Sequence, residues 1–227
     1  WNENTGILSG DVMLGCAYQQ LCKSEDKYLA QLLELFNKTA IEVCEGQQFD
    51  MNYETETDVS ISEYLRMIEL KTAVLLGCSL QTGFIIAGGS SEDQHNIYEF
   101  GRNIGIAFQL QDDLLDVFGD PNKFGKQIGG DIISNKKTYL FLKASEIGTT
   151  EQKTQLNKLF GSVETDNSEK IDIVTGIYND LSIQHRTETE MASYYNSAIS
   201  FLDKINVPED RKLPLRNFAN RLMIRDS

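Results

Sequence analysis

Residues 108–118 read F-Q-L-Q-D-D-L-L-D-V-F, and the spacing of their polar side chains decides the fold. An α-helix turns by ~100° per residue, so positions can be measured as angles from Asp112. Asp116, Gln109 and Asp113 then lie at ~40°, ~60° and ~100°. Apolar side chains fill most of the remaining circumference, Phe108 among them. We therefore predict a buried helix that carries one narrow acidic stripe.

Three carboxylates on one stripe would repel one another, so they require shared protons or a cation. No lysine or arginine occurs between Arg102 and Lys123 to supply that charge. A hard divalent cation prefers oxygen ligands, and Mg²⁺ can keep waters and reach a substrate phosphate. The alternative is a solvated acidic face, because such strings also occur on helix surfaces. The apolar flanks favour the metal site.

Helical periodicity continues through most of the chain, which contains only three prolines. We predict an all-α protein in which Ser9 caps the first helix, Ser60 or Ser62 caps the third, and Gly88 ends the third. Within the third helix, residues 72–87 are apolar almost all round, which predicts a central, buried helix. The expected helices cover residues 9–22, 25–48, about 60–88, 92–118, 137–147, 150–160, 168–182, 188–205 and 214–224. Residues 122–135 are expected to form a long loop, and loops of such length are usually functional or disordered.

Glycines and lysines follow the acidic stripe in G-K-Q-I-G-G-D (125–131) and N-K-K-T (135–138). Backbone amides freed by glycine, together with lysine ammonium groups, can cradle phosphate oxygens. A flexible surface loop has the same composition, and only the position of this loop beside the carboxylates favours phosphate binding. Lys71 interrupts an apolar helix, where it either faces an acidic group or a phosphate, or extends its amine to the surface.

Composition limits the classes of function that remain. The 227 residues carry a net charge of −13, so the overall field repels nucleic acid and anionic lipid. No apolar stretch of the ~18 residues that a membrane span needs is evident. Four cysteines without a C-x-x-C pair, and two distant histidines, oppose a zinc site, a disulfide framework and Cys/His or Ser/His/Asp catalysis. Free thiols in a reducing cytoplasm are expected.

Several elements together resemble the polyprenyl synthetase family, the trans-isoprenyl diphosphate synthases that include farnesyl and geranylgeranyl diphosphate synthases. Residues 108–138 resemble the family's second aspartate-rich motif and the lysine loop after it. Gly46 to Asp50 resembles its G-Q-x-x-D element, and Lys71-Thr72 its K-T element. Residues 7–11 resemble the stretch that follows the family's first aspartate-rich motif. The elements occur in the family's order, and the match is densest over residues 46–138.

The resemblance implies one helical domain over residues 1–227, an isoprenoid synthase-type bundle around a central cavity, and usually a homodimer. It implies Mg²⁺-dependent joining of an allylic diphosphate to isopentenyl diphosphate, head to tail. Asp112, Asp113 and Asp116 match the metal ligands, with Asp112 the direct one. The remaining matches are Lys71, Lys126 and Lys136 as clamps of the allylic diphosphate, Thr72 and Gln109 near the reacting carbon, and Gln47, Asp50, Phe108 and Asp131 in supporting positions.

One departure from the family pattern is large: the chain lacks the first D-D-x-x-D motif, and it begins at Trp1. We therefore expect a domain truncated at its N-terminus, with its first helices missing and with little synthase activity by itself. Two other functions remain open. One is a non-catalytic subunit that pairs with a complete synthase, and the other is a different Mg²⁺-dependent, all-α enzyme acting on diphosphates. The sequence does not decide the length of a prenyl product.

Overall fold

The computed structural model describes residues 2–56, 58–120, 128–161 and 166–223, and all regular structure within these ranges is helical. The all-α prediction is confirmed. The helices are α1 (Glu3–Leu21), α2 (Asp26–Tyr53), α3 (Ile61–Ile68), α4 (Val74–Ile86), α5 (Ser91–Phe118), α7 (Gly130–Ile133), α8 (Tyr139–Ile147), α9 (Thr150–Gly161), α10 (Asn167–Asp180), α11 (Ile183–Lys204) and α12 (Glu209–Met223). A π-helical segment, η1 (Glu69–Ala73), joins α3 to α4 into one continuous helix.

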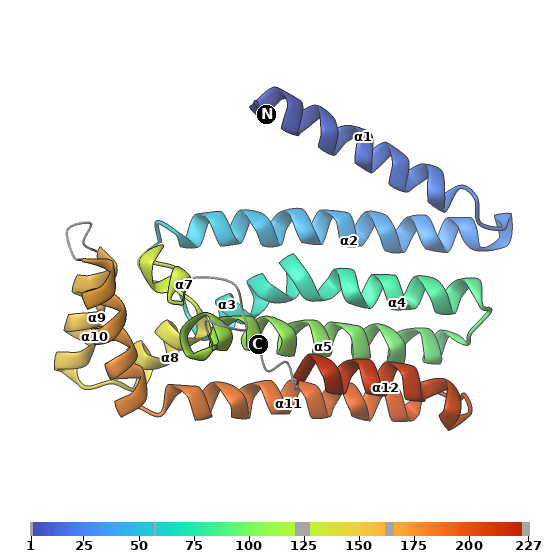
Figure 1. Ribbon diagram of the computed structural model, residues 1–227. Helices are drawn as coiled ribbons and strands as arrows, with labels where there is room; N and C mark the ends of the chain where they lie inside the picture. Colours follow the sequence, from blue (N-terminus) through green and yellow to red (C-terminus); the bar gives the residue numbers. More distant parts are fainter. Residues whose placement is uncertain (1, 57, 121–127, 162–165, 224–227) are drawn as a thin grey trace.

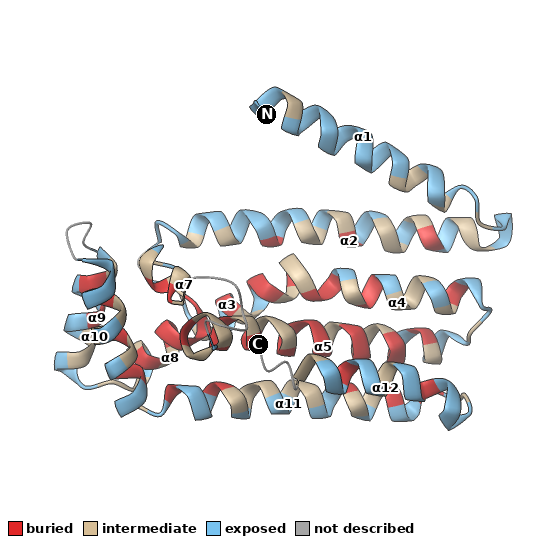
Figure 2. Cartoon of the chain, viewed as in Figure 1, coloured by how far each residue is buried: buried red, intermediate tan, exposed pale blue. Residues whose placement is uncertain are grey.

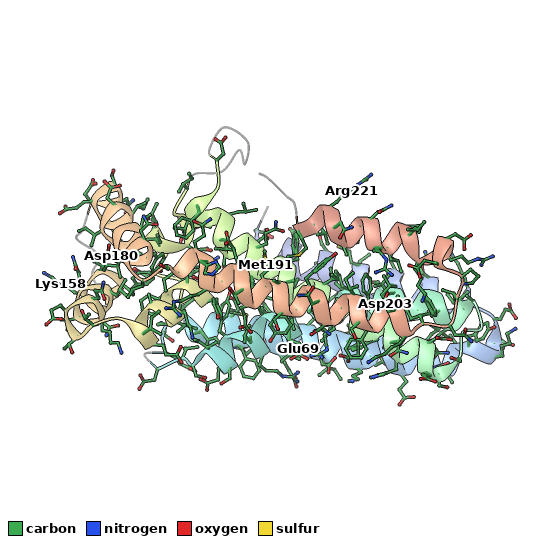
Figure 3. The ribbon with its side chains drawn as sticks, turned by 90° about the horizontal axis from the view of Figure 1, so that it is seen from below. Glu69, Lys158, Asp180, Met191, Asp203 and Arg221 are labelled. Atoms are coloured by element: carbon green, nitrogen blue, oxygen red, sulfur yellow. The ribbon has the colours of Figure 1, made fainter. Side chains whose placement is uncertain are left out.

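The long helices α2, α4, α5 and α11 lie side by side and run lengthwise through the molecule (Figure 1). Each runs antiparallel to the one before it, so α2 and α5 end where α3 begins. The short helices α7 to α10 gather at this same end. Seen from below, α11 and α12 cover the bundle, while α9 and α10, which carry Lys158 and Asp180, mark the end with the short helices (Figure 3).

Helix α5 is the buried helix of the bundle, with 15 buried positions distributed around its circumference (Figure 2). Its contacts with α4 and α11 are the most extensive between any two helices of the described residues. The prediction that residues 72–87 form a central, buried helix holds only in part, because four positions of α4 are buried and others are exposed. Only part of α4 is covered, by α2 and α5, and Leu75 and Ile86 remain half exposed.

Helix caps explain several boundaries that the sequence predicted correctly. The Ser90 hydroxyl accepts from the Asp93 amide at 3.1 Å, so α5 begins at Ser91. Ser60 forms a reciprocal capping box with Glu63, which fixes the start of α3. Gly88, with φ of 74°, follows the end of α4 as expected.

Other boundaries differ from the prediction. Asn2, rather than Ser9, caps α1, because its side chain accepts from the Thr5 amide at 2.9 Å. Helix α11 begins at residue 183 rather than 188, and α12 begins at 209 with Pro214 inside it. The expected loop 122–135 contains the short helix α7 within its described part. Residues 121–127 and the expected last residue of α12, 224, lie outside the described residues.

Helix α1 carries no buried residue, and α2 is the helix that it packs against most extensively among the described residues (Figures 1 and 2). Four apolar side chains of α1 are more than half exposed: Ile7, Leu8, Val12 and Met13. Ile41 of α2 is also more than half exposed. This apolar surface is unusual in an otherwise acidic molecule, and exposed patches of this kind mark contact sites.

Two glycines allow η1 to lie against both neighbouring helices. A Cβ atom at Gly46 of α2 would lie 2.3 Å from the Lys71 amide nitrogen, and one at Gly105 of α5 would lie 2.5 Å from the Ala73 Cα. Any side chain at either position would overlap the backbone of η1. The two glycines therefore set how closely α2 and α5 approach the segment that carries Lys71 and Thr72.

By length and composition alone, the continuous helix Ile61–Ile86 could cross a membrane, contrary to the expectation from sequence. Core helices of globular proteins meet the same test, and this one packs against α2 and α5. The contacts are therefore sufficient to explain its apolar composition.

Replacing Gly46 by alanine should destabilise the protein by about 1–3 kcal/mol, because the added methyl group forces α2 away from η1. Gly83→Ala in α4 is the matched control, since no atom lies within 4 Å of its Cβ position. The control should raise stability by about 0.5–1 kcal/mol through helix propensity. Urea unfolding followed by circular dichroism measures the free energy of unfolding of each variant. Equal changes in Gly46→Ala and Gly83→Ala would contradict the close packing at Gly46.

Candidate active site

A pocket opens at the end of the bundle where α2 and α5 end and α3 begins. Its described lining comes from α2, α3, η1, α5, α7 and residues 136–138. Met67 and Ile68 form apolar walls beside charged groups. The other lining residues are Asp50, Tyr53, Glu54, Tyr64, Lys71, Gln109, Asp113, Asp131, Lys136, Lys137 and Thr138. Antiparallel packing therefore brings together residues that are widely separated in the sequence.

Lys71 reaches into this pocket from η1 and forms an ion pair with Asp50 of α2, Nζ to Oδ2 at 2.6 Å. Of the two alternatives for this lysine, the pairing with an acidic group is therefore confirmed. Each of the two side chains remains partly accessible from the pocket. An anion entering the pocket would meet the Lys71 ammonium group, which Asp50 holds in position.

Asp113 is the most deeply buried carboxylate of the pocket, with 3% of its surface exposed. The Tyr64 hydroxyl donates to Asp113 Oδ2 at 2.5 Å, and the Tyr139 amide donates to the same oxygen at 3.4 Å. Burial raises the pKa of Asp113 to about 7, although the hydrogen bond from Tyr64 opposes the shift. The solvated acidic face is therefore wrong for this residue.

Asp116 fixes the position of α7. The Asp131 amide donates to its carboxylate Oδ2 at 3.0 Å, and the Gly129 amide donates to its backbone carbonyl at 2.6 Å. Burial raises the pKa of Asp116, while the hydrogen bond from Asp131 lowers it in part. The Asp116 contacts hold the chain after residue 128 against the end of α5.

Asp131 in turn positions Lys136. The Lys136 Nζ lies 3.1 Å from Asp131 Oδ1, and the Lys136 amide donates to the Asp131 carbonyl at 2.9 Å. Burial lowers the pKa of Lys136, but attraction to Asp131 outweighs it, so the net pKa is raised. Lys136 therefore enters the pocket as a charged group.

The adjacent Lys137 has a different partner, the backbone carbonyl of Tyr53, at 2.8 Å from its Nζ. This carbonyl belongs to the last turn of α2, where an ammonium group satisfies a free acceptor. Lys137 therefore ties the segment after α7 to the end of α2, and it also lines the pocket.

The structure brings together many of the predicted site residues, but not all. Gln109 lines the pocket, and the Thr72 hydroxyl lies 3.4 Å from its Oε1. Gln47 is exposed on α2 and is not part of the lining. Phe108 and Asp112 are half buried and also stand outside the lining. Lys126 lies outside the described residues.

Carboxylate oxygens fit a hard cation such as Mg²⁺, and Asp113 and Asp131 both face this pocket. Within the described ranges, however, no three His, Cys, Asp or Glu side chains are grouped to hold a metal ion. Mg²⁺ usually binds one or two carboxylates and completes its shell with waters and substrate phosphates. The donor set suits that mode of binding, and the metal roles of the three aspartates stay predictions.

Chemically, the pocket combines ammonium groups, carboxylates and apolar walls at the end of a helical bundle. That combination suits a substrate with an anionic head and an apolar body, held with the help of a divalent cation. The fold and the pocket are thus those of a helical protein whose site is chemically suited to an amphiphilic polyanion.

Comparison with known proteins places the chain in a family. Residues 1–178 match the polyprenyl synthetase family, and the chain belongs to it. It is 36% identical over 163 residues to the short chain isoprenyl diphosphate synthase of Methanothermobacter thermautotrophicus, covering 71% of this chain and 50% of that protein. It is 39% identical over 150 residues to the geranylgeranyl diphosphate synthase of Methanosarcina mazei, covering 65% and 46%.

Among solved structures, a geranylgeranyl pyrophosphate synthase superposes with a TM-score of 0.92 at 44% identity, covering 100% of this chain and 70% of that one. The predicted isoprenoid synthase-type bundle is confirmed. The chain spans about half the length of the first curated relatives it matches.

Sequence reasoning missed Tyr64 as a pocket residue, and it included Lys137 only within the N-K-K-T stretch, without a role of its own. Tyr64 lies seven positions before Lys71, a spacing that places two residues on one face of a helix. A hydroxyl on the same face as a partly buried lysine was a usable signal. For Lys137 the sequence offers no way to decide which of two adjacent lysines contacts the end of α2.

The raised pKa of Asp113 predicts a pH-dependent stability. The folded chain keeps this proton up to pH of about 7, whereas the unfolded chain releases it near the ordinary value of 3.8. The stabilisation is therefore present at low pH and is lost as the pH rises towards 7. The free energy of unfolding of the parent protein, relative to that of the Asp113→Asn variant, should therefore fall by up to ~1.4 kcal/mol per pH unit between these two pKa values.

The measurement is urea unfolding from pH 4.5 to 8 in the presence of a chelator, so that no metal occupies the carboxylate. A stability difference for Asp113→Asn that does not change with pH would contradict the assignment.

Proposed function

We propose that the protein to which this chain belongs is a prenyltransferase that joins an allylic prenyl diphosphate to isopentenyl diphosphate, head to tail, with Mg²⁺. The observation that carries the proposal is the convergence of Lys71, Lys136 and Lys137 on one pocket with Asp113 and Asp131. Family membership and the names of its relatives, which are isoprenyl diphosphate synthases, support it.

The charge balance of the pocket supports a role for a divalent cation. The described lining contains three lysines and four carboxyl groups, Asp50, Glu54, Asp113 and Asp131. Two of the lysines are already paired with Asp50 and Asp131. A diphosphate carries several negative charges, so the lysines alone do not neutralise it. Mg²⁺, when bound, would supply that charge and assist the departure of pyrophosphate.

In this proposal Lys71 and Lys136 bind oxygens of the allylic diphosphate, with Lys126 as a third predicted contact. The allylic C–O bond breaks, and a C–C bond forms to isopentenyl diphosphate. The proton that is then lost passes to the pyrophosphate. Gln109 and Thr72 orient their oxygen dipoles towards the positive charge that develops on carbon. Met67 and Ile68 exclude water from the apolar part of the substrate.

The alternative functions explain fewer of these contacts. A non-catalytic subunit would not require the buried Asp113 or the ion pair between Lys71 and Asp50. A different diphosphate enzyme would not require lysines from both η1 and the segment after α7. The prenyltransferase explains the pocket with one substrate class.

The test is a product assay on the intact natural protein, with isopentenyl diphosphate and dimethylallyl, geranyl or farnesyl diphosphate. Chain elongation is expected with Mg²⁺ and should be lost with a chelator. Lys71→Gln should lower kcat/KM for the allylic substrate by about 10- to 100-fold, since each lost charge-assisted contact is worth about 1.5–3 kcal/mol.

Lys158→Gln is the matched control, because Lys158 lies on α9 at the end of the molecule with the short helices (Figure 3) and lines no part of the pocket. It should leave kcat/KM unchanged. The proposal is rejected if elongation is absent, or if it proceeds equally well without a divalent cation.

We also propose that two copies associate through α1 and the outer face of α2. Val12 and Met13 of α1 are 65% and 71% exposed, and Ile41 of α2 is 60% exposed. Apolar side chains so exposed on two adjacent helices favour burial against an identical surface.

Sedimentation equilibrium at micromolar concentration should therefore report a dimer. Val12→Glu should raise the dimer dissociation constant by at least about tenfold, because a charge would be buried at the interface. Gln155→Glu adds the same charge at an exposed position of α9, away from α1 and α2, and should change the dissociation constant much less. A monomer at these concentrations would contradict the proposal.

A further inference from the structure

A buried lysine of α10 has no role in the reaction outlined above. Lys170 is 4% exposed, and lysine side chains are almost never buried to this extent unless they are paired. Its ammonium group donates to Oδ1 of Asn135 and lies 5.0 Å from the centre of the Phe160 ring. Both of these partners are neutral, and burial lowers the pKa of Lys170. If core packing were the only role of this residue, an apolar side chain would cost less free energy.

The acceptor of this hydrogen bond, Asn135, has an unusual backbone conformation directly before Lys136. Its φ of 57° lies in the left-handed region, which asparagine adopts more readily than most residues. The Lys136 amide then donates to the Asp131 carbonyl at 2.9 Å, and the Lys136 side chain lines the pocket. The conformation of Asn135 therefore sets the direction in which the Lys136 side chain leaves the backbone.

Helix α10 contacts the α7 segment at both of its ends. At the start, Gly129 has a φ of 77°, and a Cβ atom there would lie 2.8 Å from the Ile171 side chain. At the end, the adjacent Lys170 reaches Asn135. Helix α5 also binds this segment, because the Gly129 amide donates to the Asp116 carbonyl at 2.6 Å. The segment that leads into the pocket is thus anchored by two helices, and Lys170 supplies the charged contact from α10.

We propose that Lys170 is a positioning residue for Lys136: through Asn135 it fixes the backbone so that the Lys136 ammonium group faces a bound diphosphate. This inference rests on the proposed function for the identity of the ligand, and on the contacts of Lys170 and Asn135 for the role of each residue. Lys170 is not part of the described lining of the pocket, so it acts only through Lys136. Its loss should weaken the binding of a diphosphate and leave the reacting groups unchanged.

The first experiment compares Lys170→Met with the intact natural protein, using isothermal titration calorimetry with inorganic pyrophosphate at saturating Mg²⁺. Methionine keeps an unbranched apolar side chain in the core and removes the ammonium group. We expect the affinity for pyrophosphate to fall by about 3- to 10-fold, within the range of couplings between residues of one network. In the product assay the KM for the allylic diphosphate should rise by a similar factor with little change in kcat, because the contact is made in both the ground state and the transition state.

Lys212→Met is the matched control. Lys212 is 7% exposed on α12, and its Nζ donates to the backbone carbonyl of Asp203 at 3.0 Å, outside the described lining of the pocket. The control also removes a buried ammonium group and should leave the affinity for pyrophosphate unchanged. Thermal unfolding of both variants is measured alongside. If Lys170→Met lowers the unfolding temperature without changing the affinity, the role of Lys170 is purely structural and the proposal is overturned.

A Lys136→Gln background tests whether the effect passes through Lys136. Once the Lys136 charge is absent, Lys170→Met should weaken pyrophosphate binding by less than about twofold, because the two changes then affect one contact. If Lys170→Met causes the same loss of affinity with and without Lys136, it does not act by positioning that residue, and the proposal is wrong.

A second variant, Asn135→Gly, removes the same hydrogen bond and leaves the side chain of Lys170 in place, so the test does not depend on the folding of Lys170→Met. Glycine adopts the left-handed conformation readily and has no side-chain acceptor. The affinity for pyrophosphate should fall about as far as in Lys170→Met, because the backbone before Lys136 is no longer anchored. An affinity equal to that of the parent protein would also overturn the proposal.

The outcomes separate this inference from the proposed function. If the protein forms no prenyl product but Lys170→Met still weakens pyrophosphate binding through Lys136, the positioning role stands and the reaction is different. If chain elongation is observed but Lys170→Met binds pyrophosphate as tightly as the parent protein, the reaction stands and the positioning role is wrong.

Discussion

The arrangement of the pocket depends on the close packing of η1 between α2 and α5. A π-helical turn adds a residue to one helical turn, and such turns often occur at functional sites. In this protein the extra residue rotates Lys71 and Thr72 away from the direction that a regular α-helix joining α3 to α4 would give them. Gly46 and Gly105 make the arrangement possible, because any side chain there would overlap η1. The same packing brings Asp50 within reach of Lys71 and Gln109 within reach of Thr72.

The acidic composition of the chain is reconciled with an anionic substrate by how the pocket distributes its charges. Asp50 and Asp131 each hold a lysine in place and so act through their partners. Asp116 binds backbone amides and positions α7. Asp113 has no cationic partner among the described residues, and burial makes its ionised form costly. Of the carboxylates whose contacts are described here, it is therefore the one for which a divalent cation would relieve the largest electrostatic cost.

The features of the fold that the sequence predicted are those governed by local patterns. The limits of α5 follow from its periodicity and from the Ser90 cap, and they agree with the structure to within a residue. The π-helical turn at Glu69–Ala73 was not predicted, because the sequence shows no local signal for it; in the structure this turn packs against α2 and α5. The start of α1 differs from the prediction because Asn2, not Ser9, caps this helix. Helix α1 has no buried face, so no repeating pattern of apolar side chains marks where it begins. For the site, residue types were predicted well, but partners such as Tyr64 depend on tertiary packing.

The location of the pocket at the end of the bundle would allow one site to hold both ends of the proposed substrate, the diphosphate and the hydrocarbon chain. Helix ends supply chain segments that can turn polar groups inward, as at Lys136 and Asp131. The bundle interior behind them is apolar, beginning with Met67 and Ile68. The charged end and the apolar end of the pocket would therefore orient the proposed amphiphilic substrate in one direction. Because water is excluded on the apolar side, ion pairs on the polar side are stronger than at an open surface. In the proposed reaction, the same arrangement would also favour separation of charge where the C–O bond breaks.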